Sequence, residues 1–453
     1  MAPPHDTPAR LGRLRKAVYA SGDFTLNTAL AAMSLIYASY FLIEVAGLRP
    51  ALAGLVPLVG RVVDAFTDPL MGRLSDHTRW RGERRRPYFL LGAIPFGASF
   101  AMLWIDPPLV DQFARFAYYA GAYCLLSLAT TVLSVPYLAL LPEMAVDYDE
   151  RTSLNGYRNG GTILGIAAAI AIRPLAESFG GGAVGFAWAG LVFAFVLSLP
   201  WLAVHRVSFE RPQFAKRPTA IGFVEGVRIA ARHHNFRHLI GAYLCGRIAI
   251  DLTGTMLVLY FTHYIGRSAD FEKLMMVFLP SVGLSLPIWL FLARRNDKTT
   301  LFRFGSVWWS VFALSFLLAR PEWESWMIFV GASLTAFGYA AVDLMPWAML
   351  GDVIDEDDLE TGERREGLYN GVFTFLRKLA GAVAVFLALS ILDLAGLQPG
   401  GEQPESALLA TRLLTSIAPG AFLLFGLYWL RDYRLTRRRH GEILEQIGLR
   451  RVH

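Results

Sequence analysis

The sequence contains few charged residues and almost no cysteine. Asp, Glu, Lys and Arg make up 18% of its 453 residues, whereas about a quarter is usual for a soluble protein. Its two cysteines, Cys124 and Cys245, lie in apolar runs, which excludes a disulfide framework and gives no metal-ligating spacing. Instead, 54% of the residues are hydrophobic and the mean hydropathy is positive. This composition excludes a disordered chain and a cytosolic enzyme and predicts a polytopic membrane protein.

Twelve apolar runs are long enough to cross a bilayer, which takes roughly 20 residues per helix. They cover residues 17–45, 51–73, 87–107, 113–141, 153–176, 183–204, 236–264, 271–293, 301–319, 324–352, 367–393 and 407–430. The first ten residues are polar and proline-rich, so we expect no signal peptide. The predicted fold is all-α, with twelve transmembrane helices.

Basic residues accumulate on one side of the membrane if this count is right. They gather after the second span, between the sixth and seventh spans, and in the C-terminal tail, whereas the opposite loops contain only isolated basic residues. The positive-inside rule then places both termini in the cytoplasm and the chain in the plasma (inner) membrane. A basic tail is also typical of nucleic-acid binding, but beside twelve spans we interpret it as an orientation signal and expect no nucleic-acid partner.

The longest connection without a span divides the chain into two halves. The sequence predicts an N-terminal six-helix half at 1–204, a cytoplasmic connecting segment at 205–235, a C-terminal six-helix half at 236–430 and a basic cytoplasmic tail at 431–453.

The two halves also repeat a motif. The fourth span ends with Pro136-Tyr137 and Glu143, and the tenth ends with Pro346-Trp347 and Asp352; a second acid, an Arg and Asn-Gly follow in each. Two six-helix halves related by an axis along the membrane normal describe the major facilitator architecture, with a substrate cavity between the halves.

The second span contains the densest group of charges. Asp64 and Asp68 are four residues apart, hence on one helix face, and Arg61 precedes them by one turn. Two facing carboxylates repel unless a cation lies between them or one is protonated, so this pair predicts a site for Na⁺ or H⁺. Thr131 on the fourth span can add a hydroxyl oxygen. The alternative, an Arg61–Asp64 structural bridge, leaves the second acid unexplained.

Other charged residues lie inside predicted spans, where each needs a partner or a function. Asp23 suits the recognition of a polyol and equally suits a structural pair with Arg158. Lys378 can balance the acidic pair, bind a polar head group or extend to the cytoplasm. Arg247 and Asp251, at i and i+4, predict a structural ion pair. Asp343 is a secondary candidate and His263 an interfacial residue.

The loop after the second span predicts a conformational latch. Gly72 allows close helix approach, Asp76 can lie at a helix N-terminus, and the Arg run that includes Arg84 can pair with Glu143 and Asp352 across the interface of the halves. The alternative is a solvated, orienting basic loop.

These motifs resemble a known family. Asp64-Ala65-Phe66-Thr67-Asp68-Pro69, the following Arg-rich loop and the motif from Pro136 to Thr152 look like those of the glycoside–pentoside–hexuronide:cation symporters of the major facilitator superfamily. The resemblance covers essentially the whole chain. It implies Na⁺, Li⁺ or H⁺ coupling at Asp64 and Asp68, with Thr131 as a cation ligand. It also implies substrate binding at Asp23, Arg158 and Lys378.

Three positions depart from the family pattern. Thr67 replaces an Asn beside the cation, Ser134 stands where the family has a second sugar-binding carboxylate, and Leu138 replaces a stacking Trp. Losing an acid and an aromatic ring weakens the case for a galactoside-like ligand. The chain is also similar to the lysophosphatidylcholine symporter branch around Thr67-Asp68-Pro69 and Pro346-Trp347.

The main prediction is therefore a cation-coupled symporter of a sugar or glycoside that works by alternating access. The alternatives are a symporter of a lysophospholipid or similar amphiphile and, from another class, a non-transporting membrane sensor. No enzyme is predicted, because the sequence has no nucleophile–base constellation, metal spacing or phosphate loop. We expect no cofactor besides the coupling ion, a lipid bilayer as surroundings, and a monomer.

Overall fold

The computed structural model describes residues 11–80, 83–211, 223–363 and 365–452. The polar N-terminal segment and the middle of the connection 205–235 therefore lie outside the described residues. The chain divides into two compact units, Met1–Thr219 and Ala220–His453. This division falls inside the predicted connecting segment.

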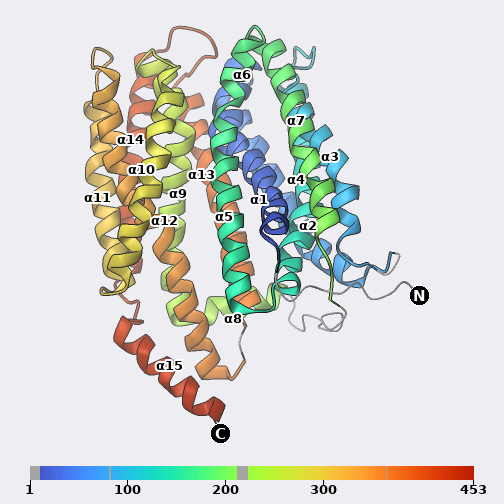
Figure 1. Ribbon diagram of the computed structural model, residues 1–453. Coiled ribbons are helices and arrows are strands. Elements are labelled where there is room, and N and C mark those ends of the chain that lie inside the picture. The colour runs from blue at the N-terminus through green and yellow to red at the C-terminus, as the bar shows by residue number, and fades with distance from the viewer. Residues whose placement is uncertain (1–10, 81–82, 212–222, 364, 453) are drawn as a thin grey trace. The chain divides into compact units, whose positions relative to one another are not determined.

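The first unit is a helical bundle, drawn in blue to green in Figure 1. Its elements are α1 (Arg13–Ala32), the π-helix η1 (Met33–Val45), α2 (Pro50–His77), α3 (Pro87–Leu103), α4 (Gln112–Met144), α5 (Tyr148–Ile170), α6 (Ile172–Ser178) and α7 (Gly182–Val207).

The second unit is also helical. Its elements are α8 (Phe223–Arg232), α9 (His234–Leu259), the π-helix η3 (Tyr260–Tyr264), α10 (Asp270–Ala293), α11 (Lys298–Leu318), α12 (Ser325–Thr361), α13 (Glu366–Leu394), α14 (Glu405–Trp429) and α15 (Arg437–Val452). Within the described residues the only β-type pairing is an isolated bridge between Trp80 and Glu83.

Eleven helical segments of the described chain are long and apolar enough to cross a membrane. In this count α1 continues into η1, α5 into α6 and α9 into η3. The remaining predicted run, 87–107, corresponds to the apolar helix α3, which has 17 residues. At 1.5 Å per residue α3 is about 25 Å long, slightly shorter than a typical hydrocarbon core.

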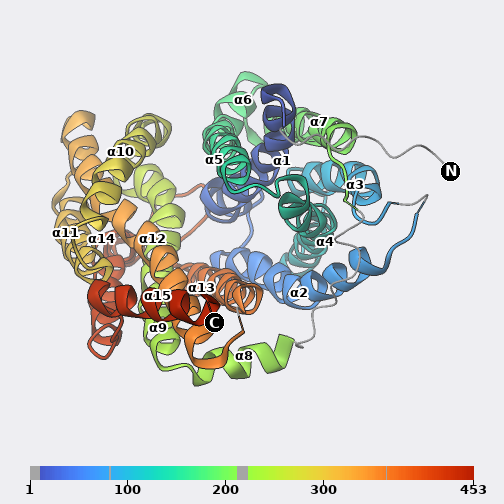
Figure 2. The same cartoon turned by 60° about the horizontal axis from the view of Figure 1, so that its bottom comes forward.

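The two units repeat one packing scheme. In the first unit α1 packs on α5 and α7, α2 on α4, and α3 on α4 and α7. In the second unit the helices at the same places in the order make the same pairs: α9 with α13 and α14, α10 with α12, and α11 with α12 and α14. The neighbours within each unit can be followed in Figure 1 and Figure 2. The duplication seen in the sequence motifs therefore extends to the three-dimensional packing of each unit.

Helix ends follow local chemistry. Pro50 and Pro87 stand at the starts of α2 and α3, where a missing backbone N–H costs nothing. The carboxylate of Asp111 accepts the Ala114 N–H at 2.8 Å at the start of α4, and that of Asp147 accepts the Glu150 N–H at 3.2 Å at the start of α5. At the far end of α12, Gly362 has a left-handed φ of +76° and stops the helix.

Two predicted spans differ from the observed helices. The run 153–176 breaks at Ala171 into α5 and α6, because Pro174 has no N–H for the Ile170 carbonyl and its ring crowds that carbonyl. The run 324–352 corresponds to α12, which continues beyond the predicted span to Thr361 through an acidic segment that needs no apolar surroundings.

The predicted basic tail contains a docked helix. Helix α15 packs against α12, with Ile443 and Ile447 buried in the core of the second unit. Its His440 lies 3.0 Å from Asp355 and 3.5 Å from Asp352, both on α12. The tail is therefore held to the unit by apolar contacts as well as by charge.

Glycines bring α5 close to α1. A Cβ added at Gly161 would overlap the carbonyl oxygen of Ala20, and one added at Gly165 would lie 2.5 Å from that of Phe24. Small residues at helix interfaces are the usual route to tight packing in membranes, where no hydrophobic force drives helices together. This contact fixes the position of Asp23, which lies on α1 between Ala20 and Phe24.

We predict that Gly161→Ala lowers the melting temperature of the detergent-solubilised protein. The methyl group must push apart two backbones, and overpacking of this kind costs about 1–3 kcal/mol. Gly160→Ala is the matched control, because the neighbouring position has open space where its Cβ would lie. It should leave the melting temperature unchanged or raise it. Equal melting temperatures for the two variants would contradict the close approach of α1 and α5.

Candidate functional site

The acidic residues of α2 lie on the face that packs against α4. Asp64 is 5% exposed, and its Oδ2 accepts from Arg61 Nη1 at 3.0 Å. The structural bridge considered from the sequence is thus present for this acid. An ion pair in a nearly dry position satisfies both charges, so Asp64 is held in place by its own helix.

Asp68, unlike Asp64, accepts a hydrogen bond from a threonine hydroxyl of the neighbouring helix. Thr131 Oγ1, on α4, donates to Asp68 Oδ1 at 2.6 Å, and Thr67 Oγ1 lies 3.5 Å from Thr131 Oγ1. Thr67 Oγ1 also donates to the Val63 carbonyl at 3.0 Å. One carboxylate and two hydroxyls are therefore together at the contact between α2 and α4. Oxygen atoms of this kind are the ligands that hard cations prefer.

A glycine allows the two helices to approach there. A Cβ at Gly60 would overlap the ring of Tyr123 on α4, whereas one at Gly72 would lie 3.9 Å from Val135, an ordinary contact. The tight contact of α2 with α4 is thus at Gly60, one turn before Asp64, and not at Gly72. The described residues contain no group of three or more His, Cys, Asp or Glu side chains that could hold a metal ion. The cation-binding role of Asp64, Asp68, Thr67 and Thr131 stays a prediction.

A second charged site lies between α1, α4 and α5. Arg158 binds Asp23 with two nitrogens, Nε to Oδ2 at 2.6 Å and Nη2 to Oδ1 at 2.9 Å. The hydroxyl of Tyr137 lies 2.5 Å from Asp23 Oδ2, and the Arg158 guanidinium lies over the Tyr137 ring. Asp23 is 6% exposed. The pair considered from the sequence is present, and a tyrosine that the sequence analysis did not assign to it completes the site.

The other predicted substrate residue of this unit is Ser134. Ser134 is partly buried on α4 and makes no hydrogen bond within the part of the chain that the structure describes. Leu138, at the position of the family's stacking aromatic ring, is 52% exposed. The apolar stretch Ala29–Met33 of the first span is mostly buried in helix packing.

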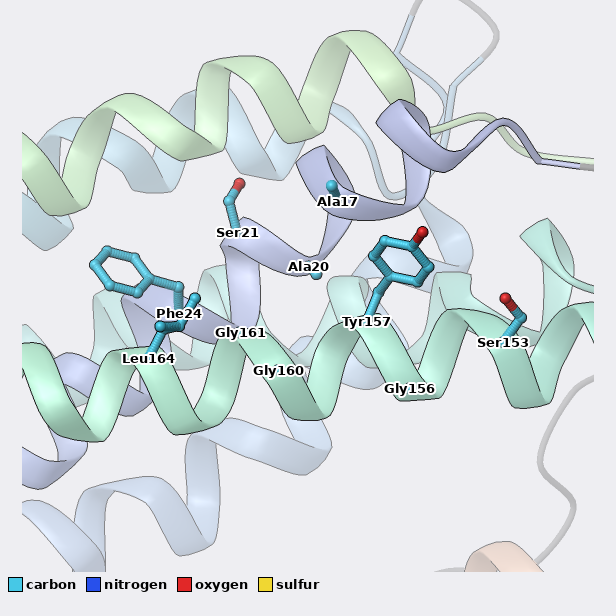
Figure 3. A pocket seen from close by; sticks show the side chains of 10 residues that line it. All are labelled: Ala17, Ala20, Ser21, Phe24, Ser153, Gly156, Tyr157, Gly160, Gly161 and Leu164. Atoms are coloured by element: carbon cyan, nitrogen blue, oxygen red, sulfur yellow. The ribbon is translucent and has the colours of Figure 1, made fainter. Parts of the chain in front are cut away.

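A groove of about 630 Å³ runs between α1 and α5 (Figure 3). It is lined by small and apolar residues and three hydroxyls: Ala17, Ala20, Ser21, Phe24, Ser153, Gly156, Tyr157, Gly160, Gly161 and Leu164. The sequence analysis missed it. The signal was the spacing of Gly156, Gly160 and Gly161 with Ala17 and Ala20, which leaves little side-chain volume between the two helices.

In the second unit the predicted ion pair is present. Arg247 Nε donates to Asp251 Oδ2 at 2.8 Å, and a second nitrogen, Nη2, contacts Oδ1. Lys378 lies on α13 next to Arg377, and both are partly buried. Asp343 is on α12 and His263 is in η3, near the end of the span. The substrate role of Lys378 stays a prediction.

The Arg-rich loop before α3 forms a network within the first unit. Arg84 Nη2 lies 3.0 Å from Glu143, and Arg85 bridges Glu143 at 2.5 Å and Asp76 at 2.6 Å. The sequence analysis placed Glu143 across the interface of the halves, but these contacts join the start of α3 to α2 and α4 of the same unit.

Glu210 completes this network and was missed by the sequence analysis. Its carboxylate accepts the backbone N–H groups of Arg84, Arg85 and Arg86 at 3.0, 2.7 and 3.1 Å, and Arg84 Nε at 3.2 Å. These amides are the unsatisfied donors just before α3, where a negative charge is favoured. The available signal was Pro87, which marks a helix start that needs an acceptor.

Asp352 occupies the matching place in the second unit. It accepts from Lys298 Nζ at 2.6 Å, and the same ammonium donates to the Ala348 carbonyl at 3.0 Å. With His440, these are the partners that the structure gives, and all belong to the second unit. Its contact with the Arg run stays a prediction.

A match to a protein family shows which class of protein this chain belongs to. The sequence profile of the family described as MFS/sugar transport protein matches residues 18–437. The chain belongs to this family. It is thus a multi-pass membrane protein of the major facilitator fold, and the solved structure of the nucleoside transporter NupG shares that fold. That likeness has a TM-score of 0.68 at 14% identity and covers 92% of this chain and 99% of that one.

Relatives of this member of the MFS/sugar transport family include symporters. The chain is 29% identical to a protein described as an uncharacterized symporter of Synechocystis sp., over 96% of each chain. It is 26% identical to the sodium-dependent lysophosphatidylcholine symporter 1-A of Danio rerio, over 90% of this chain and 83% of that one.

We predict strong coupling between Asp23 and Arg158 in a double-mutant cycle. Arg158→Gln leaves a buried carboxylate without its cation, a change that typically costs about 3–5 kcal/mol. Asp23→Asn added to Arg158→Gln should recover most of the lost melting temperature, because no uncompensated charge remains. The measurement is thermal unfolding of the wild type, both single variants and the double variant. Additive effects of the two substitutions would show that the pair does not stabilise this site as a unit.

Proposed function

We propose that the chain is a secondary active transporter that couples the entry of Na⁺ or H⁺ to symport of a sugar or glycoside. The observation that carries this proposal is the short hydrogen bond from Thr131 to Asp68 across the α2–α4 contact, on the helix face that also presents Asp64. The symporter names of its relatives support it. The proposal places the protein in the plasma membrane with both termini in the cytoplasm, working as a monomer.

The surroundings of the two acids give them different roles. Arg61 already balances Asp64, whereas Asp68 accepts a hydroxyl, a partner that a cation can share. A bound Na⁺ takes oxygen ligands from Asp68, Thr131 and Thr67, and a proton binds the Asp68 carboxylate directly. Either adds a positive charge beside Asp68. The neutralised state then favours substrate binding and the change of the open side.

The site of Asp23 and Arg158 supports a polyol substrate. A carboxylate accepts hydrogen bonds from neighbouring sugar hydroxyls, and a guanidinium donates to ring and hydroxyl oxygens. The two side chains hold each other in fixed positions, which lowers the entropy cost of binding. Ser134 of the first unit would contribute a further hydroxyl, and Lys378 of the second unit is also proposed as a substrate-binding residue.

A second candidate substrate is a lysophospholipid. The mostly apolar groove between α1 and α5 favours it, because an acyl chain gains free energy from such a surface. The Danio rerio relative described as a sodium-dependent lysophosphatidylcholine symporter also supports this candidate. The two candidates share the coupling mechanism and differ in the ligand that joins the cation.

The test is ligand binding to the purified protein in Na⁺ and Na⁺-free buffers at several pH values. One panel contains glycosides and the other contains lysolipids. We expect one panel to bind, with cation-enhanced affinity that Asp68→Asn abolishes. Asp111→Asn, a helix-cap carboxylate outside the site, is the matched control and should bind like the wild type. If ligand binding does not depend on the cation and Asp68→Asn leaves it unchanged, the result would contradict the symport proposal and favour a membrane sensor.

We predict that Thr131→Val weakens the apparent Na⁺ affinity by about tenfold, whereas Thr131→Ser changes it little. Valine removes the hydroxyl and keeps the shape, and one hydrogen-bonding group is worth about 1–1.5 kcal/mol. The readout is the Na⁺ concentration that half-saturates ligand binding. If serine and valine behave alike, Thr131 is a packing residue and the proposed cation set is incomplete.

A further inference from the structure

Helices α9 and α13 of the second unit pack in register. The rings of Tyr243 and Phe373 stack with centroids 4.1 Å apart. Eight residues further along each helix, the carboxylate of Asp251 takes the space where Gly381 lacks a Cβ. Between these two contacts, Arg247 and Arg377 occupy corresponding positions and interact electrostatically. Two arginines thus occupy the same level of neighbouring helices in the apolar part of the unit.

The two arginines differ in how they are neutralised. Arg247 pairs with Asp251 through two nitrogens. Arg377 makes no ion pair or hydrogen bond within the described chain, and its Nε is buried. The nearby carboxylates of Asp251 and Asp343 act on it only electrostatically. A partly buried guanidinium that makes no direct ion pair is costly, and membrane proteins keep such groups where they serve a function.

The hydroxyl of Tyr243 is a second hydrogen-bond donor without a partner in this region, near Arg377. Tyr243 is 1% exposed, and its hydroxyl has no hydrogen-bond partner within the described residues. The corresponding residue of the first unit is Tyr19, since α1 and α9 take equivalent places and share the pattern Tyr-x-x-Gly followed by a charge. The Tyr19 hydroxyl donates to the Tyr137 carbonyl at 2.6 Å. The second unit has kept the tyrosine without an acceptor for it.

We propose that Tyr243 and Arg377 form an anion-binding subsite that takes the carboxylate or phosphate group of the transported substrate. An anionic oxygen accepts from the phenol and from the guanidinium and supplies the hydrogen-bond acceptor that both donors lack. The fork of Arg377 matches both kinds of anion, so a sugar acid and a phosphate head group share this chemistry. The assignment of the anion to a transported substrate rests on the proposed function; the binding of an anion does not.

Trp347 provides a reporter. Its ring centroid lies 4.9 Å from that of Phe373 and 6.1 Å from that of Tyr243. We would titrate the full-length protein in detergent with glucuronate, glycerophosphocholine, inorganic phosphate and uncharged methyl glucoside, in Na⁺ and Na⁺-free buffers. Tryptophan fluorescence is recorded, and a Trp347→Phe protein identifies the signal. We expect at least one anionic probe to bind at least about tenfold more tightly than methyl glucoside. A preference for glucuronate indicates a sugar acid, and a preference for glycerophosphocholine indicates a lipid head group.

The variants test the two donors. Tyr243→Phe should weaken binding of the preferred anion about tenfold, and Arg377→Gln about a hundredfold or more. Arg377→Lys keeps the charge without the fork and should lie between the wild type and Arg377→Gln. Tyr260→Phe is the matched control, since Tyr260 is equally buried but its hydroxyl donates to the Phe316 carbonyl at 2.7 Å. It should lower the melting temperature and leave anion binding unchanged, whereas Tyr243→Phe should not lower the melting temperature of the ligand-free protein.

Two results would overturn the subsite: no anionic probe binding more tightly than methyl glucoside, or unchanged anion affinity in both Tyr243→Phe and Arg377→Lys. Either result would overturn the subsite whether or not Na⁺ is present. Anion binding that depends on Tyr243 and Arg377 but ignores Na⁺ and pH would retain the subsite and count against the proposed symport.

Discussion

The cost of a charge in a nearly dry helix bundle is the constraint on which this structure depends. Each unit places several ionisable side chains inside its spans and satisfies them in different ways. Arg158 holds Asp23 with two nitrogens and Arg247 does the same for Asp251, so both pairs act as fixed structural elements. Because desolvation is already offset within these pairs, neither needs a ligand to remain buried. Two other charged side chains in the spans bear on the proposed function.

Asp68 and Arg377 are the two groups on which the proposed roles depend. Asp68 accepts a hydrogen bond from the Thr131 hydroxyl, and oxygen atoms of both kinds are ligands that a cation can use. Arg377 lies at the level of a second arginine and near an unpaired tyrosine hydroxyl. We therefore propose a cation site in one unit and an anion site in the other. In a fold that alternates between two open sides, ligands that neutralise such sites lower the cost of passing through a closed state.

Much of the fold follows from composition and periodicity. Long apolar runs predicted the spans, and the repeated motif after Pro136 and Pro346 predicted two equivalent halves, which the packing of each unit reproduces. The pair of Asp23 with Arg158 and that of Arg247 with Asp251 were also foreseeable, because charges in apolar segments need partners. The break at Ala171 was missed although its cause, Pro174, is local and visible in the sequence. The docking of α15 and the position of Glu210 at the start of α3 were not foreseen because they depend on contacts between residues far apart in the chain. The unpaired Arg377 was hidden for the same reason, since only the register of α9 and α13 separates it from Asp251.

The central claim is that cation movement is tied to substrate movement through Asp68. The direct measurement is sodium flux in proteoliposomes that contain the purified protein, with no sodium gradient and an inward gradient of the substrate identified by binding. We expect the substrate gradient alone to drive Na⁺ into the vesicles, or protons if the coupling ion is H⁺, and Asp68→Asn to abolish this flux. Substrate uptake with no accompanying movement of either ion would contradict the account.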